Sequence, residues 1–197
     1  MGKGEQTRTA VLDRAVELAS AVGLEGLSIG RLAGETRLSK SGLFAHFESK
    51  EDLQVRILER AAERFAAVVS KPALAARRGE PRVRELFERW MRWGLEVSKP
   101  GGCIFVAASV ELDDRPGPAR DRLAQLQGEW LDFVAGAVRI AKDEGHFRPE
   151  VDPQQFAFET YGIALMTHLA FRLLRDGDAV RRARLAFERL LESARAS

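Results

Sequence analysis

The positions of the prolines limit what this 197-residue chain can fold into more than any other feature of its sequence. Residues 1–71 contain none, and the seven prolines lie at positions 72, 81, 100, 116, 118, 149 and 153. Because proline lacks a backbone N–H and clashes with the preceding helical turn, it suits first turns and linkers rather than helix interiors. The intervals predict helices at about 81–98, 103–114, 118–145, 153–175 and 178–196. No interval shows the alternation of a strand, so the sequence predicts an all-α fold.

Apolar residues recur at helical spacing before the first proline as well. Val11, Ala15, Leu18 and Val22 follow one another at steps of three or four residues, which places them on one face of a helix. Gly23 comes next and suits a left-handed helix end. Since 45% of the residues are apolar and 30% are charged, the chain has the composition of a globular protein with a substantial core.

Several classes of protein are excluded on composition and motifs. No apolar run approaches the roughly 20 residues of a membrane span, and the N-terminal residues lack the apolar stretch of a signal peptide. We therefore expect a cytoplasmic protein with no membrane partner. The single cysteine, Cys103, excludes an internal disulfide and a cysteine-cage zinc site. The three histidines are far apart, and no HExxH, CxxC, GxGxxG or P-loop motif occurs, so we expect no enzyme, metal or cofactor.

The charge is nearly balanced along the whole chain. It carries 31 Lys and Arg against 29 Asp and Glu, a net charge of +2, and the first 50 residues carry seven basic groups against six acidic ones. A surface that faces nucleic acid would therefore be a local patch produced by folding.

Residues 28–53 contain three serines that are typical of helix N-caps, Ser28, Ser39 and Ser49, because a serine hydroxyl accepts from the free amides of a first turn. Apolar residues predict one short helix after Ser28 and a second after Ser39 that extends to Phe47. Only Thr36, Arg37 and Leu38 join the two. This arrangement is typical of a helix-turn-helix, whose second helix enters the major groove of DNA. The alternative is an ordinary helical hairpin in which the serines are only caps.

The segment SIGRLAGETRLSKSGLFAHFESKEDL, preceded by AVELASAVGLEGL, resembles the DNA-binding domain of the TetR family of bacterial transcriptional regulators. The resemblance covers about the first 55 residues. It implies a three-helix helix-turn-helix domain at 1–50 and a larger helical domain at 51–197, with about nine helices in total. It also implies a regulator, in the commoner case a repressor, that binds a palindromic operator in double-stranded DNA as a homodimer and is released by a small apolar effector.

The resemblance also implies roles for individual residues. Ser28 matches a helix cap that touches a phosphate, Ser39 to Gly42 match the start of the recognition helix, and His46 and Lys50 match positions that meet the DNA backbone. The chain departs from the family in having Phe44 in place of tyrosine and Arg37 in place of a glycine with positive φ. The expected DNA-binding residues are Ser28, Arg37, Ser39, Lys40, Ser41, Gly42, Phe44, His46 and Lys50.

Thirteen of the fifteen aromatic residues lie beyond residue 60, enough to line an apolar cavity in the second domain. For each single aromatic residue, a place in the core is the more common outcome. The expected effector-binding residues are Trp90, Trp93, Phe105, Trp130, Phe133, Tyr161 and His168.

The interval 153–175 carries two apolar stripes. One contains Phe156, Thr160, Ile163, Thr167, Phe171 and Leu174, and the other contains Phe158, Leu165, Leu169 and Leu173. A helix that is apolar on more than one side needs more than one neighbour. The resemblance implies that this helix and the last one pair with their copies in a four-helix dimer interface.

Two other functions stay open on the sequence. One is a helical module that binds a partner protein without DNA. The other is a redox-sensing regulator that uses Cys103, because a helix start can lower the pKa of a thiol. A small buried hydrophobic residue is the more common role for such a cysteine.

Overall fold

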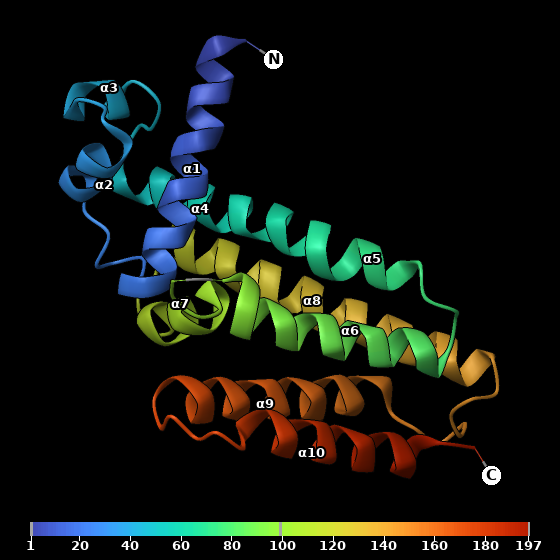
Figure 1. Ribbon diagram of the computed structural model, residues 1–197. Coiled ribbons are helices and arrows are strands. Elements are labelled where there is room, and N and C mark those ends of the chain that lie inside the picture. The colour runs from blue at the N-terminus through green and yellow to red at the C-terminus, as the bar shows by residue number, and fades with distance from the viewer. Residues whose placement is uncertain (1, 99, 197) are drawn as a thin grey trace. The chain divides into compact units, whose positions relative to one another are not determined.

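The computed structural model describes residues 2–98 and 100–196, and only the backbone of Lys3 and Phe44. Within these ranges the chain is helical and forms no strand, apart from an isolated bridge between Phe147 and Arg195 (Figure 1). The elements are α1 (Lys3–Val22), α2 (Ile29–Thr36), α3 (Lys40–Phe44), α4 (Lys50–Phe65), η1 (Ala66–Ser70), α5 (Lys71–Leu74), α6 (Glu80–Arg92), η2 (Trp93–Val97), α7 (Ile104–Leu112), α8 (Pro118–Asp143), α9 (Pro153–Arg172) and α10 (Ala179–Ala194).

The structure confirms the predicted all-α fold, and several of its helices begin at or next to a proline. Pro81 and Pro153 lie in the first turns of α6 and α9, and Pro118 begins α8. Segments α4, η1 and α5 follow one another without a break, as do α6 and η2, so the described residues form nine uninterrupted helical runs. The sequence pattern did not predict that η1 and η2 are π-helical.

The described residues pack as two compact units. The N-terminal unit lies within Met1–Phe65 and Glu96–Leu126, and the C-terminal unit lies within Ala66–Leu95 and Gln127–Ser197. This grouping by packing brings α7 and the start of α8 together with the first four helices. The functional division at residue 50 is a different division and stays a prediction.

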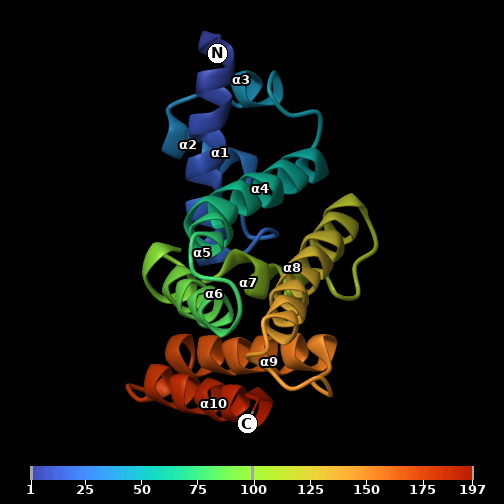
Figure 2. The same cartoon turned by 90° about the vertical axis from the view of Figure 1, so that its right-hand side faces the viewer.

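In the N-terminal unit α1 packs against α2, α4 and α7 (Figure 2). The predicted apolar face of α1 is confirmed at Val11, Ala15 and Leu18, which are buried, while Val22 at the end of the helix is half-buried. The helix ends at Gly23, whose φ of 81° requires a residue without a Cβ atom. Leu32, Leu43 and other apolar side chains from α2, α3 and α4 complete this core.

In the C-terminal unit α9 and α10 lie side by side and antiparallel, as the sequence predicts (Figure 1). The rings of Phe87 on α6 and Phe187 on α10 stack at 3.9 Å with an interplanar angle of 7°. Phe156 meets Phe187 edge to face at 6.3 Å, and both side chains are buried. These aromatic contacts form the core of the unit.

Four charged side chains close a ring at one end of the C-terminal unit. The Arg195 guanidinium donates to Glu80 at 2.7 and 2.9 Å and to Glu188 at 2.9 Å. Arg84 donates to the same two carboxylates at 3.1 Å and 2.6 Å. The hydrogen bonds from Arg195 lower the pKa of Glu80, and those from Arg84 lower the pKa of Glu188.

This ring predicts acid sensitivity. Both carboxylates have an ordinary pKa of 4.5, and a lowered pKa in the folded state means that the ionised form stabilises the fold. The stabilisation is fully present at pH values above the ordinary pKa of 4.5, and it is lost as the pH falls through the lowered pKa of the folded state. Urea unfolding between about pH 6 and about pH 3.5 measures this. We expect the variant Glu80→Gln/Glu188→Gln to lose less free energy of unfolding over that range than the wild type. Equal losses would contradict the role of the ring.

Over the described parts of the chain, no helix combines the length and the apolar character needed to cross a membrane. A group of three or more histidine, cysteine or carboxylate side chains that could hold a metal is also absent from those residues.

Candidate nucleic-acid interface

The first helix of the predicted helix-turn-helix begins at a serine cap, as the sequence predicts. Ser28 has extended backbone angles, and its Oγ accepts from the backbone N–H of Arg31 at 3.1 Å. The Lys40 side chain lies over this same first turn: a Cβ atom placed on Gly30 would be 3.8 Å from Lys40 Nζ and 4.0 Å from Ser28 Oγ. A helix N-terminus, a hydroxyl and an ammonium therefore converge, which is the chemistry that holds a phosphate.

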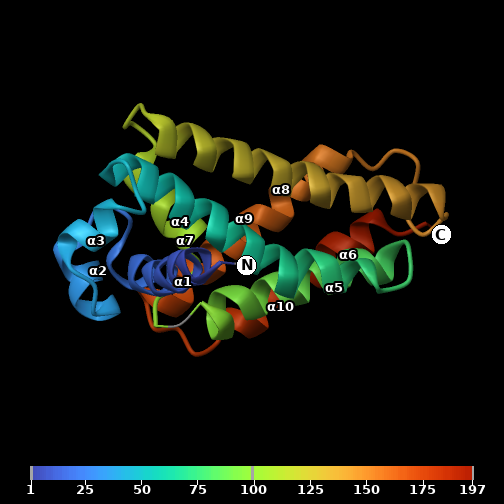
Figure 3. The ribbon, with the colours of Figure 1, turned by 90° about the horizontal axis from the view of Figure 1, so that it is seen from above.

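The second helix begins at Ser39, whose Oγ accepts from the backbone N–H of Gly42 at 3.0 Å and lies 3.0 Å from Ser41 Oγ. Helices α2 and α3 lie next to each other and beside α1 (Figure 3). Our expectation that this helix extends to Phe47 is wrong, because α3 ends at Phe44. Its last turn tightens into a bond from His46 N–H to Leu43 O. Phe47 lies beyond the helix and is buried.

The turn between the two helices has a left-handed residue at Arg37, the position at which the family resemblance implies a glycine with positive φ. Arg37 ends α2 with φ 56° and ψ 28°, and its backbone N–H donates to Ala33 and Gly34. Leu38 N–H then donates to Ala33 O at 3.1 Å, so the last carbonyls of α2 are satisfied. A side chain with a Cβ atom is strained in this conformation.

Replacing Arg37 separates stability from DNA binding. We expect Arg37→Gly to raise the free energy of unfolding by about 1 kcal/mol, because the strain of positive φ is removed. The same variant should bind operator DNA more weakly, because it removes an exposed positive charge from the interface. Urea unfolding and fluorescence anisotropy measure the two effects. Arg37→Asn is the control, since asparagine tolerates this conformation and also lacks the charge. If both variants had a lower free energy of unfolding than the wild type, the proposed backbone strain at Arg37 would be contradicted.

The basic side chains of this segment differ in their availability for DNA. Arg31, Arg37 and Lys40 are exposed and form no ion pair with any other described residue. Arg14, in contrast, bridges Glu17 at 2.9 Å and Glu35 at 2.5 Å. Arg31, Arg37 and Lys40 therefore leave exposed positive charge on α2, its turn and α3. Arg14 and, to a smaller extent, Arg31 lower the pKa of Glu35, and a basic patch that faces DNA stays a prediction.

Lys50 is not free in this conformation. Its ammonium donates to the backbone carbonyl of Glu25 at 3.3 Å and to the Glu25 carboxylate at 3.0 Å. Ser49 caps α4 as predicted, since its Oγ accepts from Asp52 N–H at 3.0 Å. The role of Lys50 at a phosphate stays a prediction, and DNA would have to compete with Glu25 for it.

The remaining predicted residues lie at the end of α3. The His46 ring is half-buried and meets the Phe47 ring edge to face at 6.4 Å. The guanidinium of Arg8, on α1, lies 5.8 Å from the centre of the same Phe47 ring. The side chain of Phe44 lies outside what the structure describes, so its expected place at the DNA stays a prediction.

Sequence reasoning missed the groups that hold the turn between α1 and α2. The Glu111 carboxylate, on α7, accepts from the backbone N–H groups of Leu24 at 2.8 Å and Glu25 at 3.2 Å. Gln54 donates to the Glu25 carboxylate at 2.6 Å. The one available signal is that Glu111 is the only charged residue in the apolar helix IFVAASVEL.

Four of the predicted effector residues form one aromatic cluster in the C-terminal unit. The Trp90 ring lies 5.4 Å from Trp130 and 5.2 Å from Tyr161, and Trp130 lies 6.0 Å from Phe133. The Tyr161 hydroxyl accepts from Gln127 Nε2 at 2.7 Å. The cluster therefore combines apolar rings with a polar group, as a ligand site does.

The other three predicted effector residues are placed differently. Phe105 belongs to the N-terminal unit, where its ring meets Phe65 edge to face at 6.0 Å. Trp93 is buried within η2. His168 is half-buried two turns after Tyr161 on α9, and burial lowers its pKa, with a smaller effect from Arg172. Burial therefore favours the neutral form of this imidazole.

The outer face of α9 and α10 exposes apolar side chains. The first stripe of α9 is buried at Phe156, Thr160 and Thr167. Leu174, which we placed on that stripe, is exposed because α9 ends two residues before it. The second stripe is exposed, together with neighbouring residues, at Phe158, Leu165, Met166, Leu169 and Leu173.

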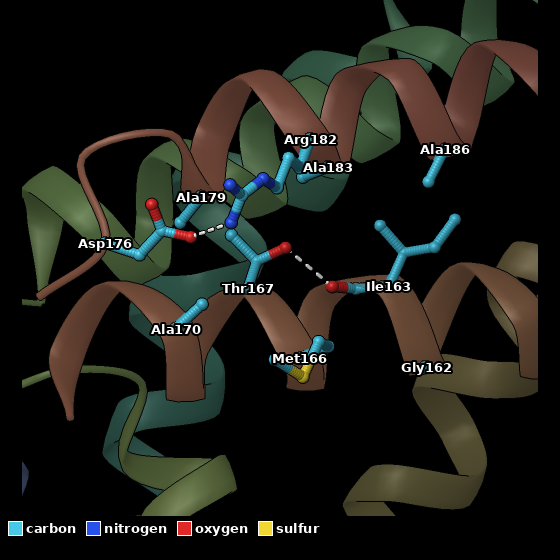
Figure 4. A pocket seen from close by; sticks show the side chains of 10 residues that line it. All are labelled: Gly162, Ile163, Met166, Thr167, Ala170, Asp176, Ala179, Arg182, Ala183 and Ala186. Carbon is cyan, nitrogen blue, oxygen red and sulfur yellow. Dashed lines mark hydrogen bonds and ion pairs between the residues drawn. The ribbon is translucent and has the colours of Figure 1, made fainter. Parts of the chain in front are cut away.

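A cavity of about 370 Å³ opens between these two helices (Figure 4). Small and apolar side chains line it, including Gly162, Ile163, Ala183 and Ala186, and Asp176 pairs with Arg182 at one end. Thr167 Oγ1 donates to the Ile163 carbonyl, so its hydroxyl is satisfied within the helix. The cavity therefore offers an almost wholly apolar surface.

Two family models match the sequence. The model described as "Bacterial regulatory proteins, tetR family" matches residues 11–57. The model described as "Tetracyclin repressor-like, C-terminal domain" matches residues 79–187. The first match contains the helix-turn-helix, and the second contains the aromatic cluster and most of the exposed apolar face.

Comparison with individual proteins also finds transcriptional regulators. The transcriptional repressor AcnR of Corynebacterium glutamicum is 34% identical over 98 residues, which cover 49% of this chain and 52% of that protein, so the match spans about half of AcnR. The uncharacterised regulator YezE of Bacillus subtilis is 25% identical over 76% of this chain and 78% of its own. A TetR regulator from Chloroflexus aurantiacus has a TM-score of 0.88 and 25% identity, with both chains covered completely. AibR, crystallised with isovaleryl coenzyme A and operator DNA, has the same fold, with a TM-score of 0.73, 22% identity and coverage of 95% of this chain and 99% of its own.

Proposed function

The chain belongs to the TetR family of bacterial regulatory proteins, which are DNA-binding transcription factors rather than enzymes, and we propose that it represses transcription as a homodimer. In this proposal residues 1–50 bind a palindromic operator in the cytoplasm. Residues 51–197 dimerise and bind a small apolar effector that releases the DNA.

The observation that carries the proposal is the arrangement of α2 and α3. Lys40 and Ser28 converge on the first turn of α2, and Ser41 is exposed on α3. Gly42 has no side chain, so the backbone of α3 can approach the floor of the major groove. Lys40 then holds a phosphate at the α2 N-terminus, and Ser41 reaches base edges.

The exposed apolar face supports a dimer. Phe158, Leu169 and Leu173 are large apolar side chains that a second copy would cover, and an exposed contiguous apolar patch marks an interaction site. A two-fold dimer presents two α3 helices to successive major grooves about 34–36 Å apart. When one subunit has bound its half-site, the second subunit is held close to the other half-site, so the dimer binds the operator more tightly than a single subunit does.

The aromatic cluster supports an apolar effector with at least one polar group. Trp90, Trp130 and Phe133 are apolar rings that pack against one another, and Tyr161 with Gln127 adds a hydrogen-bonding pair, so a ligand would enter by displacing part of this packing. Binding of this effector must weaken DNA binding by the same factor by which DNA weakens binding of the effector. Cys103 is only 3% exposed, so its thiol is screened from oxidants, and we favour an effector over a thiol switch.

The proposal is tested by replacing Lys40. We expect Lys40→Ala to weaken operator binding about 5- to 150-fold and to reduce the slope of log affinity against log salt by about two, because each of the two subunits loses one phosphate contact. Lys50→Ala should also weaken binding. Lys71→Ala is the matched control, since Lys71 is exposed on α5, outside the interface. Wild-type affinity and an unchanged salt slope for both Lys40→Ala and Lys50→Ala would contradict this docking.

A further inference from the structure

The turn between α1 and α2 is held by a side chain from a distant part of the chain. Both Leu24 N–H and Glu25 N–H point at one oxygen, Glu111 Oε2, at 2.8 and 3.2 Å. These residues are separated from Glu111 by 87 and 86 positions. A carboxylate that accepts two backbone N–H groups makes charge-assisted bonds, which are stronger than bonds between neutral groups.

The backbone next to this contact leaves no room for another arrangement. A Cβ atom on Gly23 would lie 1.6 Å from Glu111 Oε1, so the carboxylate occupies the space that any other residue would fill. Gly23 also has φ 81°, a conformation that favours glycine. The end of α1 and the carboxylate are therefore fitted to each other.

The segment before α7 makes a second attachment to α1. Gly101 N–H donates to Ser20 Oγ at 3.2 Å, and Gly102 N–H donates to Ser20 O at 3.4 Å. A Cβ atom on Gly101 would lie 1.8 Å from the same carbonyl oxygen. The backbone before α7 therefore contacts the backbone at the end of α1 directly, which holds the start of α7 close to the end of α1.

Side chains of α4 also hold this turn. Glu25 accepts from Gln54 at 2.6 Å and from Lys50 at 3.0 Å, and Arg115 lies 3.7 Å away. Gln54 is buried, whereas the Glu25 carboxylate is exposed. The turn that leads into α2 is therefore clamped by contacts from both α4 and α7.

We propose that Glu111 is a positioning residue for DNA recognition: through the two amides of the turn it sets the direction in which α2 leaves α1. The α3 helix is joined to α2 by a turn of three residues, so a change in that direction moves α3 as well. Glu111 would touch no DNA. A shift of α7 would reach the recognition helix through this carboxylate, which gives regulation a physical route within the N-terminal unit. The inference rests on the DNA-binding function proposed above.

The test compares three substitutions at Glu111 with a control just after the end of α7. Glu111→Ala removes the acceptor, Glu111→Asp keeps the charge but shortens the reach, and Glu111→Gln keeps an acceptor oxygen at the same distance. Asp114→Ala is the control, because Asp114 is exposed and nearby. The measurements are operator affinity by fluorescence anisotropy at several salt concentrations and hydrogen exchange of the Leu24 and Glu25 amides.

We expect Glu111→Ala and Glu111→Asp to lose at least about tenfold in affinity with an unchanged salt slope, because no phosphate contact is removed. The Leu24 and Glu25 amides should exchange faster in both. Glu111→Gln should lose less affinity than Glu111→Ala, because it keeps an acceptor oxygen that forms weaker, neutral bonds, and Asp114→Ala should stay within about threefold of the wild type. Affinities are compared only for variants that circular dichroism shows to be fully folded. If Glu111→Ala does not fold, Glu111→Asp takes its place in the comparison.

Faster exchange of the two amides with wild-type operator affinity would overturn the positioning role. Slow exchange in Glu111→Ala would show that the clamp does not exist. A wild-type chain that binds no DNA fragment would refute the proposed function instead, while the exchange measurement would still report on the clamp.

Discussion

A chain carrying Leu169→Asp and Leu173→Asp is expected to be a folded monomer that binds operator DNA about 10²- to 10⁴-fold more weakly than the wild type. The two side chains are 43% and 72% exposed on the outer face of α9, so carboxylates there leave the core of the single chain unchanged. In the proposed dimer each new carboxylate would be buried without a partner, which is strongly unfavourable.

Sedimentation velocity measures the oligomeric state, and anisotropy on the same samples measures binding to the operator. Leu74→Asp is the matched control, because Leu74 is 47% exposed on α5, away from this face. The control should stay dimeric and bind the operator as the wild type does. A double variant that remains a dimer would place the interface elsewhere on the chain.

Phe187→Ala is expected to lower the free energy of unfolding by about 3–5 kcal/mol. Its ring is 2% exposed and stacks on Phe87, which is 1% exposed, and it also meets Phe156 edge to face. Truncation removes the stacked pair and leaves a cavity between α6, α9 and α10. Phe187→Leu fills part of that space and should cost less.

Urea unfolding at one fixed protein concentration is the measurement, because dimerisation makes stability depend on concentration. A lower midpoint with an unchanged m-value identifies lost packing. A loss of less than about 1 kcal/mol in Phe187→Ala would contradict the role of this ring pair as the core of the C-terminal unit.

Local patterns predicted most of the fold. The prolines bounded the helices, since Pro81, Pro118 and Pro153 each lie in or at a first turn. The cap at Ser28 was also predicted, because capping depends on a few adjacent residues, whereas the positive φ at position 37 came only from the resemblance to the family. Helical spacing predicted that α9 is apolar on more than one side, but it did not predict which of its apolar residues are buried within the chain.

What the sequence could not predict depends on residues far apart in the chain. The ion pair of Lys50 with Glu25, 25 positions away, was not predicted. The role of Glu111 was not predicted, because the two backbone amides that it accepts from lie just after the end of α1, 87 and 86 positions away in the sequence. Phe105 was grouped with Trp90, but tertiary packing places it against Phe65. Residue spacing carries no information about such pairs, which arise when helices pack.

The most direct test of the central claim is selection of genomic DNA fragments by the purified wild-type chain in dilute buffer with no small molecule added. The account predicts that fragments carrying an inverted repeat are retained by a dimer, that affinity falls steeply with salt, and that sequence preference remains as salt rises. A folded chain that stays monomeric and retains no fragment would contradict it.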